Sequence, residues 1–451
     1  MPRSAEASAL RRNAAGSGTT VESAASLLGD LFPICRSITG DGVRRTFKIL
    51  RDLVDFHVRE VASGTVCFDW VVPDEWNVRD AFIATEDGRR VVDFRVSNIH
   101  LVSYSEPVDA VLSFAELEPH LHVHHSLPKA IPYRTSYYRR GWGFCLTAAQ
   151  LRSLDRSARY HVRIDTTLAP GSLSYGERVL QGGSGREFLV STYCCHPSMA
   201  NDNLSGVVIW TLLLKELAKR TLRHSYRFVI APETIGAIAY LCRNEAAMKK
   251  VEGGFVISTA GGPGPLAYKH TFESDGYIDR VALQALRDSG LAFVEHPFSV
   301  MGSDERSYSS PAFRIPVGTI CKDKYYEYAE YHSSLDNLDF VKPEALVTSL
   351  NAYLSAIDIL ERDARFDSLA PPAETQLGKR GLYGGAGGAT LPKPVGEAGA
   401  NDVGTVLTVL FWADGHTSLL EMAERTRLPF AALADAADRL KAAQLIREAR
   451  A

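Results

Sequence analysis

Apolar residues along the middle of the chain form short runs that alternate with segments of helical spacing. Residues 187–195 alternate and then become continuously apolar and β-branched, which predicts a buried strand. Residues 203–220 carry apolar positions at helical intervals, which predicts a helix directly after that strand. Parallel strands with crossover helices follow from this order, so we predict an α/β core. Its later elements are expected to be strands at 226–232, 253–258, 266–270 and 314–320 and helices at 236–244 and 277–287.

The region before this core has a different pattern of apolar and polar residues. Residues 21–37 and 44–53 have helical patterns that would pack on the sheet. Between residues 72 and 145 long amphipathic helices are missing, and turns alternate with short strand-like runs at 81–85, 89–94 and 99–104. We therefore expect an inserted β-rich domain at 72–145.

The last part of the chain has the pattern of a separate small domain. Glycine and proline are frequent from residue 370 to 401, which predicts a linker. Residues 402–451 match a helix-turn-helix or winged-helix order, with helices at 403–413, 419–426 and 430–443 and a turn at 414–418. The helix in the recognition position carries Asp435 and Asp438 and only Arg439 as a base, whereas phosphate contact needs more cations. We therefore expect docking or homo-oligomer formation through this domain, and no nucleic-acid partner.

Composition narrows the class of protein. The 451 residues are 45% hydrophobic, which is enough to bury a large core in more than one domain. The net charge of −3 argues against general nucleic-acid binding, and seven scattered cysteines suggest a reducing compartment. Residues 1–19 lack the apolar run of a secretory signal and are expected to form a disordered leader. No stretch reaches transmembrane length, so we expect a cytoplasmic protein without a membrane partner.

The loop between the strand at 187–195 and the following helix carries His196 and Asp202. Imidazole and carboxylate groups bind divalent metals, and the carboxyl edge of a parallel sheet is where substrate can reach such a site. Asp202 could instead cap the helix that begins near Leu204, and His196 could be a buried histidine with a satisfied hydrogen bond. The loop alone leaves both interpretations open.

Two further segments favour the metal interpretation. Glu233 follows directly on the predicted strand at 226–232, and a carboxylate at a strand end suits a general base. His332 lies among tyrosines and acidic residues in the segment 327–337. It could complete a His, Asp, His ligand set.

Six segments carry a resemblance to known proteins: LFPICRSITGDGVR, IPYRTSYYRRGWGFC, CCHPSMANDNLSG, APETIGAIAYL, MGSDERSYSSPAFRIPVG and EYAEYHSSLDNLDFV. With them the chain resembles the zinc-dependent aminopeptidase superfamily, and more closely an aminopeptidase-like family with an inserted β domain and a C-terminal winged helix. The resemblance implies a three-layer αβα catalytic core over 20–71 and 146–369. The insert would then occupy 72–145 and the winged-helix-like domain 402–451.

The resemblance also implies a ligand set. In the two-zinc aminopeptidases a bridging aspartate, two histidines, a glutamate and a second aspartate bind the metals, and a neighbouring glutamate is the base. Carried over, His196, Asp202 and His332 become ligands and Glu233 the base.

Two departures from that pattern affect the second metal. Thr234 stands where those enzymes have a glutamate ligand, and the segment 258–265, STAGGPGP, has no carboxylate where they have an aspartate. One zinc with three protein ligands and an open position is therefore implied, with Asp304 as the remaining candidate ligand. Two histidines and one carboxylate also suit iron(II).

Candidate substrate-binding residues lie in two segments. The polar segment 301–308 contains Asp304 and Glu305, which could hold an α-ammonium group, and Arg306, which could bind a carboxylate, and it ends at Tyr308. A solvated surface turn is the alternative. Aromatic and basic residues crowd together at 132–145, where Arg134 and Tyr137 could cover the active site or form a domain interface.

These observations predict a metal-dependent aminopeptidase or amidohydrolase that acts on a small peptide-like or aminoacylated molecule through a zinc-activated water. A specialised biosynthetic enzyme that forms an amide, transfers an acyl group or cyclises its substrate at the same metal is one alternative. A ligand-binding protein that has lost catalysis is the other. The intact set of His196, Asp202, Glu233 and His332 argues against the latter.

Overall fold

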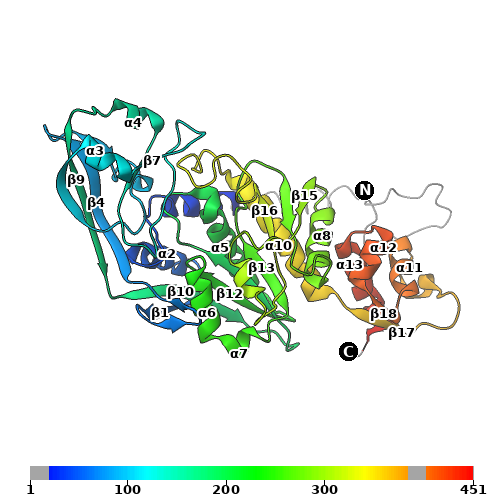
Figure 1. The fold of residues 1–451 in the computed structure, drawn as a ribbon. Coiled ribbons are helices and arrows are strands. Elements are labelled where there is room, and N and C mark those ends of the chain that lie inside the picture. Colours follow the sequence, from blue (N-terminus) through cyan, green and yellow to red (C-terminus); the bar gives the residue numbers. More distant parts are fainter. Residues whose placement is uncertain (1–19, 384–402, 450–451) are drawn as a thin grey trace. The chain divides into compact units, whose positions relative to one another are not determined.

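The computed structural model describes residues 20–383 and 403–449 (Figure 1). The leader predicted at 1–19 lies outside the described residues, as does the greater part of the linker predicted at 370–401. The chain divides into two compact units. One contains the chain up to Ser274 together with Phe293–Asn351, and the other contains Asp275–Ala292 and the chain from Ala352 onward.

An eight-stranded sheet forms the centre of the first unit (Figure 1). Its strand order is β1 (His57–Ala62), β10 (Ser172–Leu180), β12 (Ser225–Ala231), β11 (Glu187–Tyr193), β13 (Gly253–Ile257), β16 (Val317–Lys322), β14 (Leu266–Lys269) and β15 (Phe293–His296). The strands β12, β11, β13 and β16 are parallel, as predicted. The prediction of parallel strands is wrong for the outer part, because β1, β10 and β14 pair antiparallel with their neighbours.

Helices cover both faces of this sheet, as the alternation along β12 makes clear. Phe228 points to one face, where its ring lies 5.7 Å from that of Trp210 on α5 (Gly206–Leu217). The next residue, Val229, belongs to a cluster with Tyr240 on α6 (Ile235–Arg243). Successive side chains of a strand point to opposite faces, so α5 and α6 lie on opposite sides of the sheet. The other helices of this unit are residues 20–31, α2 (Asp41–Arg51), α7 (Glu245–Met248), the short α9 (Glu305–Tyr308) and the start of α10 (Pro343–Arg362).

The inserted region is built on a four-stranded antiparallel sheet. Its order is β5 (Arg90–Asp93), β4 (Glu75–Thr85), β9 (Arg159–Ala169) and β6 (Val108–Ser113). β9 lies beyond residue 145, where we expect the insert to end, yet it pairs with β4 along most of its length. Every second side chain of β9 from Tyr160 to Thr166 is buried. This alternation in the sequence could have predicted β9 as a further strand of the insert.

Smaller elements complete the insert. The run at 99–104 is not the predicted strand: η1 (Asn98–His100) is a 3-10 turn, and single bridges follow it. Its remaining elements are α3 (Phe114–Leu117), η2 (Glu118–His120), β7 (Leu121–Val123), β8 (Phe144–Leu146) and α4 (Ala148–Ser153), and the short strands β2 (Val66–Cys67) and β3 (Trp70–Val71) pair just before the insert.

The second unit has a winged-helix arrangement. A three-stranded sheet of β18 (Asp414–Ser418), β17 (Arg365–Ser368) and β19 (Ile446–Glu448) accompanies α11 (Val403–Phe411), α12 (Leu419–Thr426) and α13 (Phe430–Ala442). The predicted turn at 414–418 is strand β18, because its backbone pairs with β17 although its side chains are mostly polar. α8 (Tyr277–Asp288) belongs to this unit, and η4 (Leu377–Arg380) precedes the undescribed segment. No helix of the described residues has the length and apolar character needed to span a bilayer.

Candidate metal and catalytic site

The loop that follows β11 holds Asp202 in a fixed backbone position. The two carboxylate oxygens of Asp336 accept the backbone N–H groups of Asn201, at 2.5 Å, and of Asp202, at 2.9 Å. The Asn203 amide donates to the Tyr193 carbonyl at 3.1 Å, and the Asn201 side chain accepts the Gly261 N–H at 2.8 Å. The asparagines on either side of Asp202 therefore bind backbone groups, and only the aspartate side chain is left to face the histidines.

Three of the predicted residues come together here. His332 Nε2 lies 3.0 Å from Asp202 Oδ2, and His196 Nε2 lies 3.9 Å from the same oxygen. Their ligand atoms all lie within 4.8 Å of one another. Asp202 Oδ2 and His332 Nε2 are buried and have no aligned hydrogen-bond partner despite their short separation. Two buried ligand-type atoms this close without a hydrogen bond of good geometry fit a shared cation.

The other oxygen of Asp202 has different surroundings. Tyr193 donates to Asp202 Oδ1 at 2.6 Å, and the Tyr193 hydroxyl also lies 2.8 Å from Ser258 Oγ. Burial alone would raise the pKa of Asp202, but His196, His332 and the Tyr193 hydrogen bond together lower it to about 2. Burial lowers the pKa of His196 to about 4. An ionised carboxylate beside a neutral imidazole is the protonation state that metal ligands require.

Glu233 stands beside this cluster at the end of β12. Its Oε2 lies 3.8 Å from His196 Nε2, and its backbone N–H donates to Cys195 Sγ at 3.3 Å. Burial, followed by the charges of Asp304 and Asp202, raises the pKa of Glu233 well above its usual range. Asp304 accepts the Thr234 N–H at 2.7 Å, and burial raises its pKa to about 7. Burial thus raises the pKa of both carboxyl groups beside the cluster, Glu233 and Asp304.

Tyr133 was not among the predicted site residues, but its ring lies against both histidines. Its backbone N–H donates to the His332 carbonyl at 2.8 Å, and its ring centre lies 5.3 Å from that of His196 and 5.2 Å from that of His332. Tyr137 reaches the site through its hydroxyl, which hydrogen-bonds that of Tyr133. Arg134 is exposed. The segment 132–137 therefore covers the site, and Tyr133 is its innermost side chain.

The polar segment 301–308 is mostly buried, contrary to the expectation of a loop that grips substrate. Glu305 is 1% exposed and accepts hydrogen bonds from the Ser303 backbone, Thr319 and Tyr325. Tyr308 is fully buried with its hydroxyl 2.9 Å from Ser191 Oγ. Neither side chain is available to a substrate. Their partners come from distant strands and loops, which local sequence cannot reveal.

Arg306 and Asp304 differ in their exposure to solvent and in their distance from the proposed ligands. Arg306 is exposed, and its guanidinium donates weakly to Thr234 Oγ1 at 3.4 Å. Asp304 is buried beside Glu233 and does not belong to the His196, Asp202 and His332 group.

A buried arginine, Arg36, donates hydrogen bonds to the loop that carries His196. Arg36 is 1% exposed and donates to the carbonyls of His196 at 2.9 Å, Leu31 at 2.8 Å and Pro197 at 3.4 Å. It makes no ion pair with a carboxylate among the residues that the structure describes. Its segment, residues 31–44, was one of the six that carried the resemblance, but no local pattern indicated that Arg36 binds the ligand loop.

A central sheet with helices on both faces, a β-rich insert and a C-terminal winged helix make this an aminopeptidase-like protein. The chain belongs to the family described as a domain of unknown function, DUF4910, whose model matches residues 25–363. A winged helix-turn-helix model, HTH_47, matches residues 364–448, which confirms the predicted class of the C-terminal domain.

Known proteins resemble the chain over nearly its full length. A Clostridium acetobutylicum protein, provisionally named as a polysaccharide biosynthesis protein with an aminopeptidase-like domain, is 41% identical over 422 residues, 94% of this chain and 95% of the relative. A crystal structure from the same organism, provisionally titled as a peptidase, has a TM-score of 0.90 and 39% identity and covers 98% of this chain and 99% of that chain. A zinc aminopeptidase from Bacillus subtilis shares the fold, with a TM-score of 0.55, 13% identity and coverage of 76% and 94%.

Proposed function

We propose that this protein is a zinc-dependent aminopeptidase-like hydrolase that cleaves an amide bond in a small peptide-like or aminoacylated substrate. The observation that carries the proposal is the pair of buried atoms Asp202 Oδ2 and His332 Nε2, 3.0 Å apart without an aligned hydrogen bond. Leaving two buried polar atoms unpaired costs about 1–3 kcal/mol each, so a third group that both can bind is needed.

The donor set suits zinc. His196, Asp202 and His332 supply two nitrogens and one oxygen, the number that catalytic zinc sites use, with one position left open. Ligands about 2.0–2.1 Å from a tetrahedral zinc lie about 3.3 Å from one another, close to the 3.0 and 3.9 Å separations found here. When bound, zinc would acidify a coordinated water and polarise the carbonyl of the scissile amide.

The surroundings of Asp202 favour one metal over two. A bridging aspartate would offer one oxygen to each metal, but Tyr193 donates to Oδ1 at 2.6 Å. Ser258 lies on the far side of the same hydroxyl, 2.8 Å from it. Thr234 follows Glu233 where the two-zinc enzymes place a ligand. These contacts support the proposal of a single metal at this site.

Glu233 is the residue we propose for proton transfer. It lies 3.8 Å from His196 Nε2, beside the open side of the ligand set, and its side chain is 26% exposed. Its raised pKa makes the ionised form a stronger base, which would accept a proton from the attacking water and deliver it to the leaving amine. The Tyr133 ring packs against both His196 and His332 beside it.

The substrate side of the proposal rests on size and charge. Tyr133 and Tyr137 close the site from the insert, which favours a small substrate over a folded protein. Arg134 and Arg306 are exposed cations on the two predicted substrate segments, and each could bind a carboxylate of the substrate.

The test compares wild-type protein with Glu233→Gln on a panel of aminoacyl p-nitroanilides and short peptide amides, with zinc content measured for both. We expect hydrolysis by the wild type and a loss of about 10²–10⁴-fold in kcat with zinc retained. Amide products formed with an added amine would point to acyl transfer. Unchanged substrates together with measurable ligand binding would contradict the hydrolase and favour a binding protein.

A further inference from the structure

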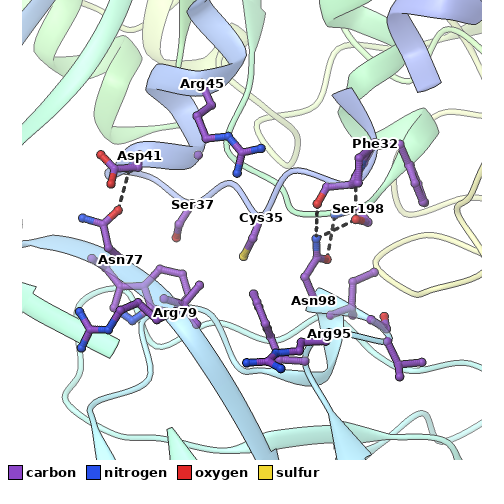
Figure 2. A pocket seen from close by; sticks show the side chains of 18 of the residues that line it. Phe32, Cys35, Ser37, Asp41, Arg45, Asn77, Arg79, Arg95, Asn98 and Ser198 are labelled. Atoms are coloured by element: carbon purple, nitrogen blue, oxygen red, sulfur yellow. Dashed lines mark hydrogen bonds between the residues drawn. The ribbon is translucent and has the colours of Figure 1, made fainter. Parts of the chain in front are cut away.

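A large cavity lies beside the loops that carry the proposed ligands but is not lined by those residues. It has a volume of about 1010 Å³ and opens between the N-terminal segment and the insert (Figure 2). His196, Asp202, Glu233 and His332 are absent from its lining. Ser198 and Ser334, each two residues from a histidine of the proposed metal site, do line it. The cavity therefore borders the same two loops from a different direction.

The walls of this cavity are rich in arginine. Arg45, Arg79 and Arg95 line it, against a single carboxylate, Asp41. Figure 2 shows the Arg45 guanidinium directed from α2 into the open space. Asp41 is already paired with Arg44, 3.2 Å away. Within residues 20–383 and 403–449, Arg45 forms no ion pair, so its charge faces the cavity uncompensated.

The other two arginines each form an ion pair with a carboxylate of the insert. Arg79 on β4 is paired with Asp165 on β9, and Asp165 also lies 3.7 Å from Arg163. Arg95 is held by Asp80 at 2.9 Å. Because each guanidinium has five N–H donors, one ion pair leaves further donors for a ligand. The Arg79 and Arg95 side chains are 64% and 67% exposed, so a ligand can reach the donors that the ion pairs leave unused.

Further polar groups surround the arginines. Asn77 lines the cavity and accepts the Asp41 N–H at 2.7 Å, at the start of the 11-residue helix α2, whose N-cap Gly40 offers no side-chain cap. The positive end of the α2 dipole therefore adds to the arginine charges. Asn98 links the cavity to the ligand loop, because it donates to Ser198 Oγ at 2.8 Å and accepts the Ser198 N–H at 3.2 Å.

We propose that this cavity binds a small polar molecule through an oxyanion group, either a phosphate or a carboxylate. Both groups accept paired hydrogen bonds from a guanidinium fork, and three arginines line this space. A volume of about 1010 Å³ is at the upper end of what small-molecule sites offer. This site is additional to the proposed hydrolase site and does not depend on it.

The test is isothermal titration of the zinc-loaded full chain with inorganic phosphate and, separately, with malonate. The variants are Arg45→Gln, Arg95→Gln and the control Arg51→Gln, which changes an exposed arginine in the last turn of the same helix. We expect saturable binding of at least one anion, at least about tenfold weaker in Arg45→Gln and in Arg95→Gln and unchanged in Arg51→Gln. The anion that binds more tightly identifies the group, phosphate or carboxylate.

Three results would overturn the proposal. The first is the absence of saturable binding of either anion. The second is binding that is equal in the wild type, Arg45→Gln and Arg95→Gln, because the anion would then lie at the metal or elsewhere. The third is an equal loss in Arg51→Gln, which would reveal attraction to charge in general. Thermal unfolding without ligand verifies that each variant is folded, and Arg45 and Arg51 are both exposed.

Discussion

The two oxygens of the Asp202 carboxylate have different partners, and at the residue scale this difference defines the site. Oδ1 accepts a hydrogen bond from the Tyr193 hydroxyl, whereas Oδ2 lies 3.0 Å from His332 Nε2 and 3.9 Å from His196 Nε2. Tyr193 acts on the proposed metal through Asp202, since it fixes the orientation of the carboxylate. The single-metal proposal depends on this hydrogen bond.

Replacing Tyr193 tests its role directly. We expect Tyr193→Phe to lower zinc affinity about 10- to 100-fold, because Asp202 loses the donor that orients it. Competition with a chromophoric chelator measures the affinity. Tyr160→Phe is the matched control, since Tyr160 is buried in the insert and donates to the Asp155 carbonyl. Equal zinc affinities of Tyr193→Phe and the wild type would show that Tyr193 does not position Asp202 for metal binding.

Glu305 is predicted to be a structural residue, because it forms a buried pair with Lys269. Their charged atoms lie 3.6 Å apart, and both side chains are 2% exposed. We expect Lys269→Met to reduce the free energy of unfolding by about 3–5 kcal/mol, because the Glu305 charge is left uncompensated. Adding Glu305→Gln should restore part of that loss. Urea unfolding of the two single variants and the double variant gives the coupling, and additive losses would contradict a direct interaction.

The sequence predicted the proposed ligands but not the residues that contact and position them. His196, Asp202, Glu233 and His332 were predicted from strand ends and from resemblance, and they lie together in the structure. Arg36 and Tyr133 were missed, because their contacts join residues 160 and about 200 positions apart along the chain. No periodicity within a short segment reports such pairs.

At the scale of elements, the centre of the sheet was predictable and its edges were not. Parallel strands buried on both faces, such as β11 and β13, have continuous apolar runs that differ from the surrounding helices. β14 has the same apolar character, yet it pairs antiparallel with β16. Direction within a sheet depends on the connection, which apolar patterning does not encode. β18 was missed for the opposite reason, because a short edge strand with polar side chains resembles a turn.

The junction of α2 and the insert gives a pH-dependent prediction. Arg44 on α2 binds both oxygens of Glu75 on β4, the shorter contact at 2.6 Å, and this hydrogen bond is the main cause that lowers the pKa of Glu75 to about 2. The unfolded carboxyl titrates near 4.5. The pair therefore stabilises the fold above about pH 4.5, and that contribution is lost as the pH falls towards 2.

Glu75→Gln should consequently be less stable than the wild type by about 1–2 kcal/mol at pH 7, a value reduced by the partial exposure of Arg44. The difference should shrink as the pH falls below 4.5. Urea unfolding at pH 7, 5, 4 and 3 measures it, with Glu86→Gln as a control at an exposed position after β4. A difference that stays constant with pH would show that the ion pair is not its source.

At the scale of the whole molecule, the winged-helix unit is larger than its family segment. α8 lies between β14 and β15 in the sequence, yet it belongs to this unit. Arg280 on α8 forms an ion pair of 2.6 Å with Glu424 on α12, and Asp288 accepts the Phe430 N–H at 2.9 Å. Sequence patterning could not assign α8 to this unit, because its partners lie about 140 residues later.

Removing residues 402–451 should therefore destabilise more than the winged helix. Without α12 and α13, α8 loses the Arg280 and Asp288 contacts and its packing against α12. We expect the shortened chain to unfold at a Tm several degrees lower, or to be recovered as aggregates, in scanning calorimetry. Recovery of a folded chain with unchanged Tm would mean that α8 is stable without these partners.

The central claim is a single zinc held by His196, Asp202 and His332. Elemental mass spectrometry on protein purified without chelators or nickel affinity resins tests it most directly, beside the folded variants His196→Ala and Asp202→Ala. We predict about one zinc per chain in the wild type and a loss of that zinc in both variants. Two zinc ions per chain would contradict the role of Tyr193, and a wild type without metal would contradict the proposed hydrolase.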